Sequence, residues 1–151
     1  MARSNNRIQW LNDLVRLEIA LWNHISASLQ EKHDLSLAFF EVLYAIAQTE
    51  EGSLRVGDIA RALTITVGAA SKLADRIVAA GLVRRELDSE DRRASRLALT
   101  DAGQRRLDAA NVTYASALST RLDKTLTQSE QRGLHDLVKR LLAASPEPSG
   151  N

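Results

Sequence analysis

The sequence predicts a mainly α-helical fold that carries one small β-hairpin. Both prolines, Pro146 and Pro148, lie in the last six residues, so long helices are free to form in the rest of the chain. Apolar residues recur there at steps of three and four, the helical period, and one short region, residues 82–99, alternates as paired strands do. The 151 residues, 44% of them hydrophobic, fit one compact domain or two small lobes that share a core.

A long amphipathic helix is expected over about residues 8–30. Its apolar stripe comprises Leu11, Leu14, Val15, Leu21, Trp22, Ile25 and Leu29. A second helix is expected over residues 37–48, with Ser36 as its N-cap and with Phe40, Leu43, Tyr44 and Ala47 at the same spacing. The first stripe needs a partner to cover it.

Two shorter helices follow, over residues 56–63 and from the N-cap Thr66 to residue 80, where Gly81 stops the helix. The turn between them is short, as a helix-turn-helix requires. The second of the pair should bury Ala70, Leu73, Ala74 and Ile77 and expose Ala69, Lys72, Asp75, Arg76 and Ala79.

The exposed side of that helix is small near its start and basic further on. Such a helix enters a major groove about 12 Å wide without collision, and Thr64, Thr66, Ser71 and Lys72 then reach base edges or phosphates. An ordinary surface helix carries the same residue types, so this pattern alone does not decide between the two.

The hairpin is expected from strands over residues 82–87 and 95–99, with turn formers at residues 88–91. Such a projecting hairpin, here called the wing, lays Arg92 or Arg93 along the minor groove, where narrow A·T-rich tracts concentrate negative potential. Phosphate would repel Asp91, so we expect Asp91 to pair with a nearby arginine and orient the wing. The alternative is a solvated charged loop with no partner. A helix-turn-helix followed by a basic wing is more specific than either half, and it indicates duplex DNA as a partner.

Charge is distributed in agreement with this interpretation. Residues 54–100 contain nine lysines and arginines against six acids, a net charge of +3, whereas the remainder has eleven against thirteen, a net of −2. Affinity for phosphates follows local patches rather than the total of +1.

Several classes of function are disfavoured. The chain has no cysteine, which excludes disulfides and thiol-based sensing, and its three histidines (His24, His33 and His135) are dispersed. No phosphate-cradling glycine motif or metal-ligand spacing is present, so we expect neither an enzyme, a cofactor nor a metal. No segment approaches the roughly 20 apolar residues that cross a bilayer, so we expect a cytoplasmic protein with no membrane partner. Residues 146–151 should form a flexible tail.

Residues 53–105 resemble the MarR family of transcriptional regulators. The resemblance rests on residues 56–63 (VGDIARAL), 71–76 (SKLADR), 81–83 (GLV), 91–93 (DRR) and 99–103 (LTDAG). The wing pattern Asp-x-Arg-x5-Leu-Thr is matched by Asp91, Arg93, Leu99 and Thr100. Outside the motif the resemblance rests on the arrangement of helices.

The resemblance implies a homodimer that binds a pseudo-palindromic operator, usually as a repressor released by a small aromatic or phenolic ligand. It also implies that Arg93 is the wing-tip arginine inserted in the minor groove and that Asp91 is its orienting acid. The branch of the family that senses peroxide through a reactive thiol is excluded for this chain.

A dimer is also expected from the ends of the chain. Thr100 is the expected N-cap of a fifth helix that runs to about residue 122, and residues 127–130 (TQSE) form a capping box that opens a sixth. The sixth helix carries Leu134, Leu137, Val138, Leu141 and Leu142 at helical spacing. The first, fifth and sixth helices expose more apolar surface than one small motif covers, so a second copy or an intrachain bundle must bury it. Two-fold pairing would set two recognition helices about 34 Å apart, one turn of DNA.

The chain is therefore divided into a helical dimerisation region (residues 1–35 and 101–145) and a winged helix-turn-helix (residues 36–100). A ligand pocket between them would be lined by Trp22, Phe39, Phe40 and Tyr44; the alternative is that these aromatic side chains belong to the core. A winged-helix protein-interaction module is the alternative function, and it leaves the arginines of the wing unused.

Overall fold

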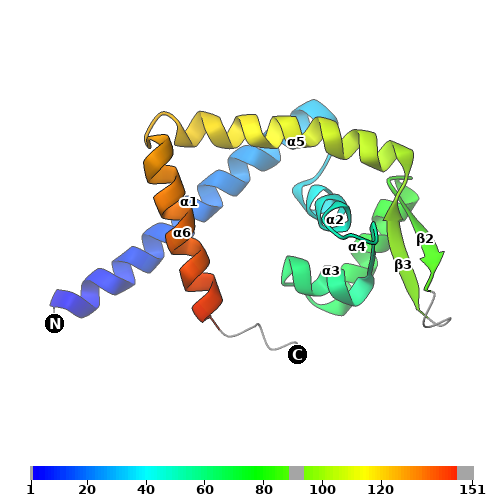
Figure 1. Cartoon of the computed structure of the whole chain (residues 1–151), viewed down its shortest axis with the longest axis horizontal. Coiled ribbons are helices and arrows are strands. Elements are labelled where there is room, and N and C mark those ends of the chain that lie inside the picture. The colour runs from blue at the N-terminus through cyan, green and yellow to red at the C-terminus, as the bar shows by residue number, and fades with distance from the viewer. Residues whose placement is uncertain (1, 89–93, 146–151) are drawn as a thin grey trace.

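The fold consists of long helices at both ends of the chain and a compact centre of three short helices and a small sheet. The computed structural model describes residues 2–88 and 94–145 (Figure 1). The described elements are α1 (Ala2–His33), α2 (Leu37–Ala47), β1 (Ser53–Arg55), α3 (Val56–Leu63), α4 (Val67–Ala79), β2 (Val83–Leu87), β3 (Ser95–Leu99), α5 (Asp101–Leu122) and α6 (Gln128–Ala144). The mainly helical fold with a hairpin is confirmed, whereas the expected flexible tail, residues 146–151, lies outside the described residues.

Hydroxyl side chains begin four of the helices, as the sequence predicts. Ser36, Thr66, Thr100 and Thr127 each accept a hydrogen bond from a backbone N–H three residues later. Glu130 completes the capping box by accepting from the N–H of Thr127 at 2.8 Å. The largest departure is α1, which extends beyond the predicted helix at both ends.

The sheet has three strands rather than the two of the predicted hairpin, in the order β1-β3-β2. Strands β2 and β3 are antiparallel and pair Val83 with Leu99 and Leu87 with Ser95. The unpredicted strand, β1, pairs antiparallel with the other edge of β3, with Arg55 opposite Arg96. Three residues are too few to show strand alternation, so β1 is detectable only through its pairing. Strand β3 of the wing is therefore paired along both of its edges, with β1 on one and β2 on the other.

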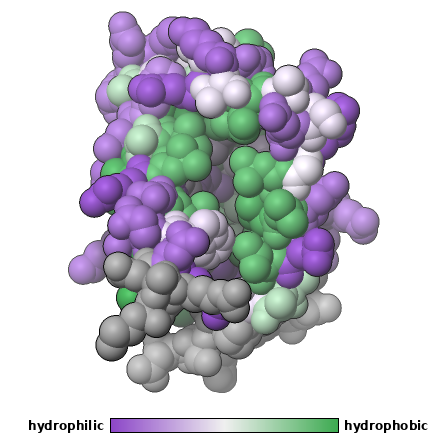
Figure 2. Space-filling view, turned by 90° about the vertical axis from the view of Figure 1, so that its left-hand side faces the viewer, coloured by the Kyte–Doolittle hydropathy of each residue, from purple (hydrophilic) through white to green (hydrophobic). Residues whose placement is uncertain are grey.

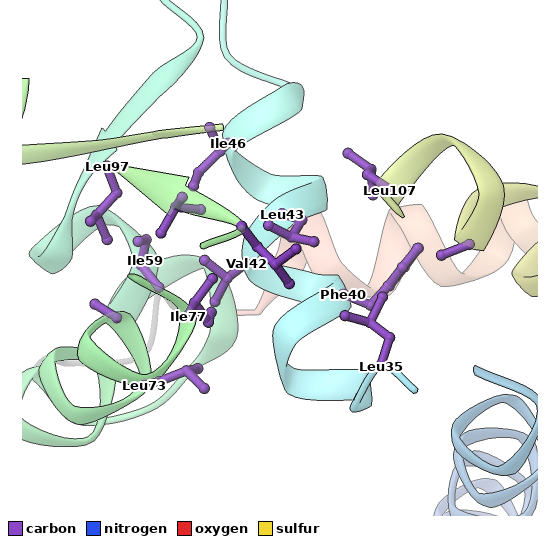
Figure 3. Packing of buried hydrophobic residues seen from close by; sticks show 14 of the residues in the cluster. Leu35, Phe40, Val42, Leu43, Ile46, Ile59, Leu73, Ile77, Leu97 and Leu107 are labelled. Atoms are coloured by element: carbon purple, nitrogen blue, oxygen red, sulfur yellow. The ribbon is translucent and has the colours of Figure 1, made fainter. Parts of the chain in front are cut away.

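Helix α2 lies at the centre of the core. Its Val42, Leu43 and Ile46 are fully buried, and Figure 3 shows them among side chains from α3, α4 and β3. Near the start of α2, Phe40 lies beside Leu35 and on the side of α2 that faces α5, which carries Leu107 (Figure 3). One continuous core therefore joins the helix-turn-helix to α1 and α5.

The start of α5 is pressed against the turn that follows α4. Gly81 ends α4 with a φ of 71°, a backbone conformation that glycine adopts without strain. Thr100 donates from its N–H to the Leu82 carbonyl (3.1 Å) and from its hydroxyl to the Gly81 carbonyl (2.7 Å). A Cβ on Gly103 would lie 1.9 Å from the Leu82 carbonyl oxygen. Only glycine therefore permits this approach of α5 to the wing.

The outer parts of α1 and α6 expose large apolar side chains. They lie on the side of the molecule away from α3, α4 and the sheet, and α5 connects the two regions (Figure 1). Among the described residues α6 buries no side chain. Figure 2 shows that this side carries two apolar areas with a hollow between them. No described helix is long and apolar enough to span a membrane.

Candidate nucleic-acid interface

The turn between α3 and α4 exposes both of the threonines predicted to reach DNA. Thr64 follows α3 in the left-handed conformation (φ 55°), and the N–H of Ile65 donates to the Ala60 carbonyl at 3.0 Å. Thr66 then caps α4, with its Oγ1 accepting from the N–H of Ala69 at 3.1 Å. Thr64 and Thr66 both reach the surface, beside the first turn of α4.

Helix α4 has one buried and one exposed face, with the residues divided as predicted. The buried residues are Ala70, Leu73, Ala74 and Ile77, and the exposed ones are Ala69, Lys72, Asp75, Arg76 and Ala79. Ser71 is half-buried. No acid lies in the first turn of α4. After the exposed Val67, this face carries small side chains and then the basic side chains of Lys72 and Arg76, with Asp75 between them. Its small residues allow a close approach to a major groove.

Two charged residues of this face are tied to neighbouring elements. The Arg76 guanidinium lies over the ring of Phe39 in α2, with 5.4 Å from its central carbon to the ring centre, a cation–π contact. Asp75 forms an ion pair with Arg85 of β2, and Arg85 also donates to Ser95 Oγ of β3 at 2.9 Å. These contacts connect α4 to α2 on one side and to the wing on the other.

The tip of the wing, residues 89–93, lies outside the described residues. The predicted roles of Asp91, Arg92 and Arg93 therefore stay predictions. The two arms remain joined up to the edge of the described part, where the N–H of Asp88 donates to the Ala94 carbonyl at 3.3 Å.

A buried carboxylate lies at the base of the wing. The Asp88 side chain is only 1% exposed. Arg55 donates to it with two parallel bonds, from Nε to Oδ2 at 2.7 Å and from Nη2 to Oδ1 at 2.9 Å. Arg55 directly precedes α3, and its N–H donates to Asp58 Oδ2 at 3.2 Å. The base of the wing is thereby fixed to the first helix of the helix-turn-helix.

A second arginine joins the same cluster from β3. Arg96 Nη1 lies 3.5 Å from Asp88 Oδ2, and Arg96 donates to Ser53 of β1 through Nε to Oγ (2.8 Å) and through Nη2 to the carbonyl (2.9 Å). Arg96 also pairs with Glu51. We name Arg55, Asp88, Arg96, Ser53 and Glu51 the wing-base cluster.

Sequence reasoning placed Asp88 among the turn formers and missed this cluster. Asp88 does directly follow β2, but its side chain is buried and paired. Its partners lie 33 and 8 residues away in sequence. Pairing over the longer separation depends on the register of β1 with β3, which no local pattern reveals.

The aromatic residues predicted to line a ligand pocket do not all converge. Phe40 is buried and stacks on Tyr44, with ring centres 5.9 Å apart, whereas Phe39 packs against Arg76. Trp22 lies partly exposed on α1, and the described part of the chain shows no ring contact between it and the others. Sequence reasoning missed Tyr114 of α5, which stacks on Phe40 with ring centres 4.9 Å apart.

Two ionisable groups of this aromatic cluster have shifted pKa values. Burial raises the pKa of Glu41, the residue between Phe40 and Val42 on α2. The pKa of Tyr114 is also raised, first by burial and then by the nearby charges of Glu41 and Tyr44. A half-buried carboxyl group and a phenol therefore lie together where α2 meets α5.

A separate, shallow depression lies between the end of α1 and the start of α5. Lys32, His33, Arg105 and Arg106 line it together with Glu31 and Asp34. Arg106 donates to the His33 carbonyl, and His33 Nε2 lies 2.7 Å from Thr113 Oγ1. The depression is thus polar and distinct from the aromatic cluster. Within residues 2–88 and 94–145 no group of His, Asp and Glu side chains is arranged to hold a metal ion.

Comparison with known proteins agrees with this geometry. Residues 33–94 match the model of the MarR family. An uncharacterized HTH-type transcriptional regulator of Bacillus cereus is 26% identical over 119 residues, which cover 79% of this chain and 78% of that protein.

Solved structures share the fold over nearly the whole chain. Sco3205 of Streptomyces coelicolor, a MarR family transcriptional regulator in complex with DNA, superimposes with a TM-score of 0.82 at 24% identity, covering 97% of this chain and 90% of that one. A mutant MarR from Escherichia coli, complexed with operator DNA, gives a TM-score of 0.78 at 25% identity, covering 91% of this chain and 96% of that one.

Proposed function

We propose that this chain is a DNA-binding transcriptional regulator of the MarR family, whose model matches residues 33–94, and that it acts as a homodimeric repressor of a pseudo-palindromic operator. The observation that carries the proposal is the exposed face of α4, where small residues precede Lys72 and Arg76 with no acid in the first turn. This face is fixed to the basic wing by the Asp75–Arg85 pair. A helix and a wing held in one unit fit a major groove and the adjacent minor groove.

Lys72, Arg76, Ser71, Thr64, Thr66 and Ala69 form the major-groove part of the proposed interface. Arg92 and Arg93 form its minor-groove part, and Asp91 orients them. Roughly half to two-thirds of the hydrogen bonds in such interfaces reach the DNA backbone. The basic side chains of α4 therefore contribute to affinity and to the register on DNA more than to sequence specificity.

The proposed homodimer follows from unpartnered apolar surface. The exposed large apolar residues of α1 and α6 are Ile8, Trp10, Leu11, Leu14, Val15, Leu17, Ile19, Trp22, Leu134, Leu137, Val138, Leu141 and Leu142. A surface of this kind on a soluble protein marks an interface. The terminal helices, residues 1–35 and 101–145, therefore serve as the dimerisation region, and residues 36–100 serve as the DNA-binding region. A two-fold axis through the dimer then repeats α4 for the second half-site.

A small aromatic or phenolic ligand is the proposed releasing signal. The stacked rings of Phe40, Tyr44 and Tyr114 join α2 to α5, and Phe39 of the same helix α2 contacts Arg76 of α4. A ring that inserts beside this stack, with Trp22 of α1 as a further wall, would displace α2 and so move Arg76. The ligand thereby acts on the helix that contacts DNA, by favouring one of two positions of α4.

A fluorescence-anisotropy titration tests the proposed function. The purified chain is titrated onto duplex DNA flanking its own gene at about 50 and about 200 mM salt, with unrelated duplex as competitor. We expect tight, salt-dependent binding that the competitor does not displace, with two chains per site. Binding no tighter than to unrelated DNA would contradict an operator at this position. The alternative function, a winged-helix protein-interaction module, would be favoured if the chain bound a protein partner and added DNA did not displace that partner.

A further inference from the structure

The leading edge of α4 exposes a large apolar side chain far from α1 and α6. Val67, the first residue of α4, is 61% exposed, and Ile65 in the preceding turn is 37% exposed. Their positions next to Thr64 and Thr66 place them at the end of the helix that leads into the proposed groove.

Groups able to read bases by hydrogen bonding are scarce at this end. The Thr66 Oγ1 is already the acceptor for the N–H of Ala69. Gly68 and Ala69 have no polar side-chain atom, and a Cβ on Gly68 would meet nothing within 4 Å. The first long polar side chain on the exposed face is Lys72, more than one turn later. The leading edge of α4 therefore offers methyl groups and an open approach beside the two threonine hydroxyl groups.

One base presents a matching apolar group in the major groove. Thymine carries a methyl group on C5, whereas the other major-groove edges present hydrogen-bonding atoms. We propose that Val67 is a specificity-determining residue that contacts a thymine methyl group in each half-site of the operator. The inference rests on the proposed function, because it requires α4 to lie in the major groove.

Removal of single methyl groups from the DNA tests this contact. The full chain first selects its preferred duplex from a random library, and each thymine of that duplex is then replaced in turn by deoxyuridine, which lacks only the methyl group. Burial of one methyl group corresponds to about a fourfold change in affinity. We expect the wild-type chain to lose about this factor at one thymine of each half-site.

The variant Val67→Ala identifies the partner of that methyl group. We expect Val67→Ala to bind the thymine and deoxyuridine duplexes equally at that position, since the two changes remove the same contact and are not additive. The matched control is Val112→Ala on α5, also an exposed valine, which should discriminate as the wild type does. At the same position, the wild type should bind a duplex with 5-methylcytosine more tightly than a duplex with cytosine. Val67→Ala should bind these two duplexes equally.

Failure of the Val67 contact and failure of the proposed DNA-binding function give different results. If the wild type selects a site but tolerates deoxyuridine at every thymine, or if Val67→Ala keeps the full discrimination, the contact is refuted while the regulator stands. If the library yields no enriched sequence and binding equals that to random duplex, the proposed function fails, and the inference with it.

Discussion

Asp88 and Arg55 form a two-bond ion pair that fixes the wing to the helix-turn-helix. The pair joins the end of β2 to the residue that precedes α3, and the carboxylate is almost completely buried. A buried charge is tolerated only when it is paired and hydrogen-bonded. The contact therefore joins the base of the wing directly to the start of α3.

We expect Asp88→Asn to lower the free energy of unfolding by about 1–3 kcal/mol, because it removes the buried negative charge that both Arg55 and Arg96 contact. Urea denaturation measures the change. The control is Glu86→Gln, which removes a negative charge two residues before Asp88. Glu86 forms an exposed ion pair with Arg84, so the effect of this variant should stay within about 0.5 kcal/mol. Equal effects of the two variants would contradict a structural role for the wing-base cluster.

Arg93→Ala should weaken operator binding by about 1–3 kcal/mol, because a wing arginine in the minor groove contributes both charge and shape readout. Anisotropy titration against the selected operator measures the loss. Arg121→Ala, an exposed arginine near the far end of α5, is the charge-matched control. Wild-type affinity in Arg93→Ala would refute the wing assignment.

Lys72→Ala should weaken binding to all sequences alike and reduce the slope of log affinity against log salt by about one, because one phosphate contact is lost. The titration is repeated over a range of salt concentrations. Lys124→Ala, just after α5, serves as the control for net charge. An unchanged slope would show that Lys72 does not contact phosphate.

Leu137→Arg should convert the chain to a monomer, because it places a charge in the apolar surface of α6. Sedimentation velocity measures the assembly state. The matched control, Leu87→Arg, changes an exposed leucine on β2 and should leave the dimer intact. A dimer that persists in Leu137→Arg would move the interface away from this part of α6.

Glu41→Gln should stabilise the fold at neutral pH relative to the wild type. The pKa of Glu41 is higher in the folded chain than in the unfolded one, since burial penalises its charged form. The folded state therefore holds the proton more tightly, and wild-type stability falls as pH rises through the window above the ordinary pKa of 4.5. Unfolding measured at several pH values should show the difference between the two chains growing from acid to neutral pH. A constant difference would contradict the shift.

Local chemistry made most of the fold predictable. The caps Ser36, Thr66, Thr100 and Thr127 act within three residues of sequence, so the helix starts could be read directly. The faces of α4 were predictable because helical periodicity is also local. By contrast, β1 and the Arg55–Asp88 pair depend on which strands meet, and Tyr114 reaches Phe40 only through the packing of α5 on α2.

The predicted aromatic pocket shows the same limit. Phe39 and Phe40 are adjacent in sequence, so they point to different sides of α2, one toward Arg76 and one into the core. The sequence identified these aromatic residues but could not assign them to a common face. The contact between Phe39 and Arg76 was hidden for the same reason.

Hydroxyl-radical footprinting of the protein on its selected operator tests the central claim most directly. A dimer that inserts two α4 helices predicts two protected segments related by two-fold symmetry, with centres about one helical turn, or 10–10.5 base pairs, apart. Protection should extend into the flanking minor grooves where the wings lie. A single protected segment, or protection without two-fold symmetry, would contradict a dimeric winged-helix repressor.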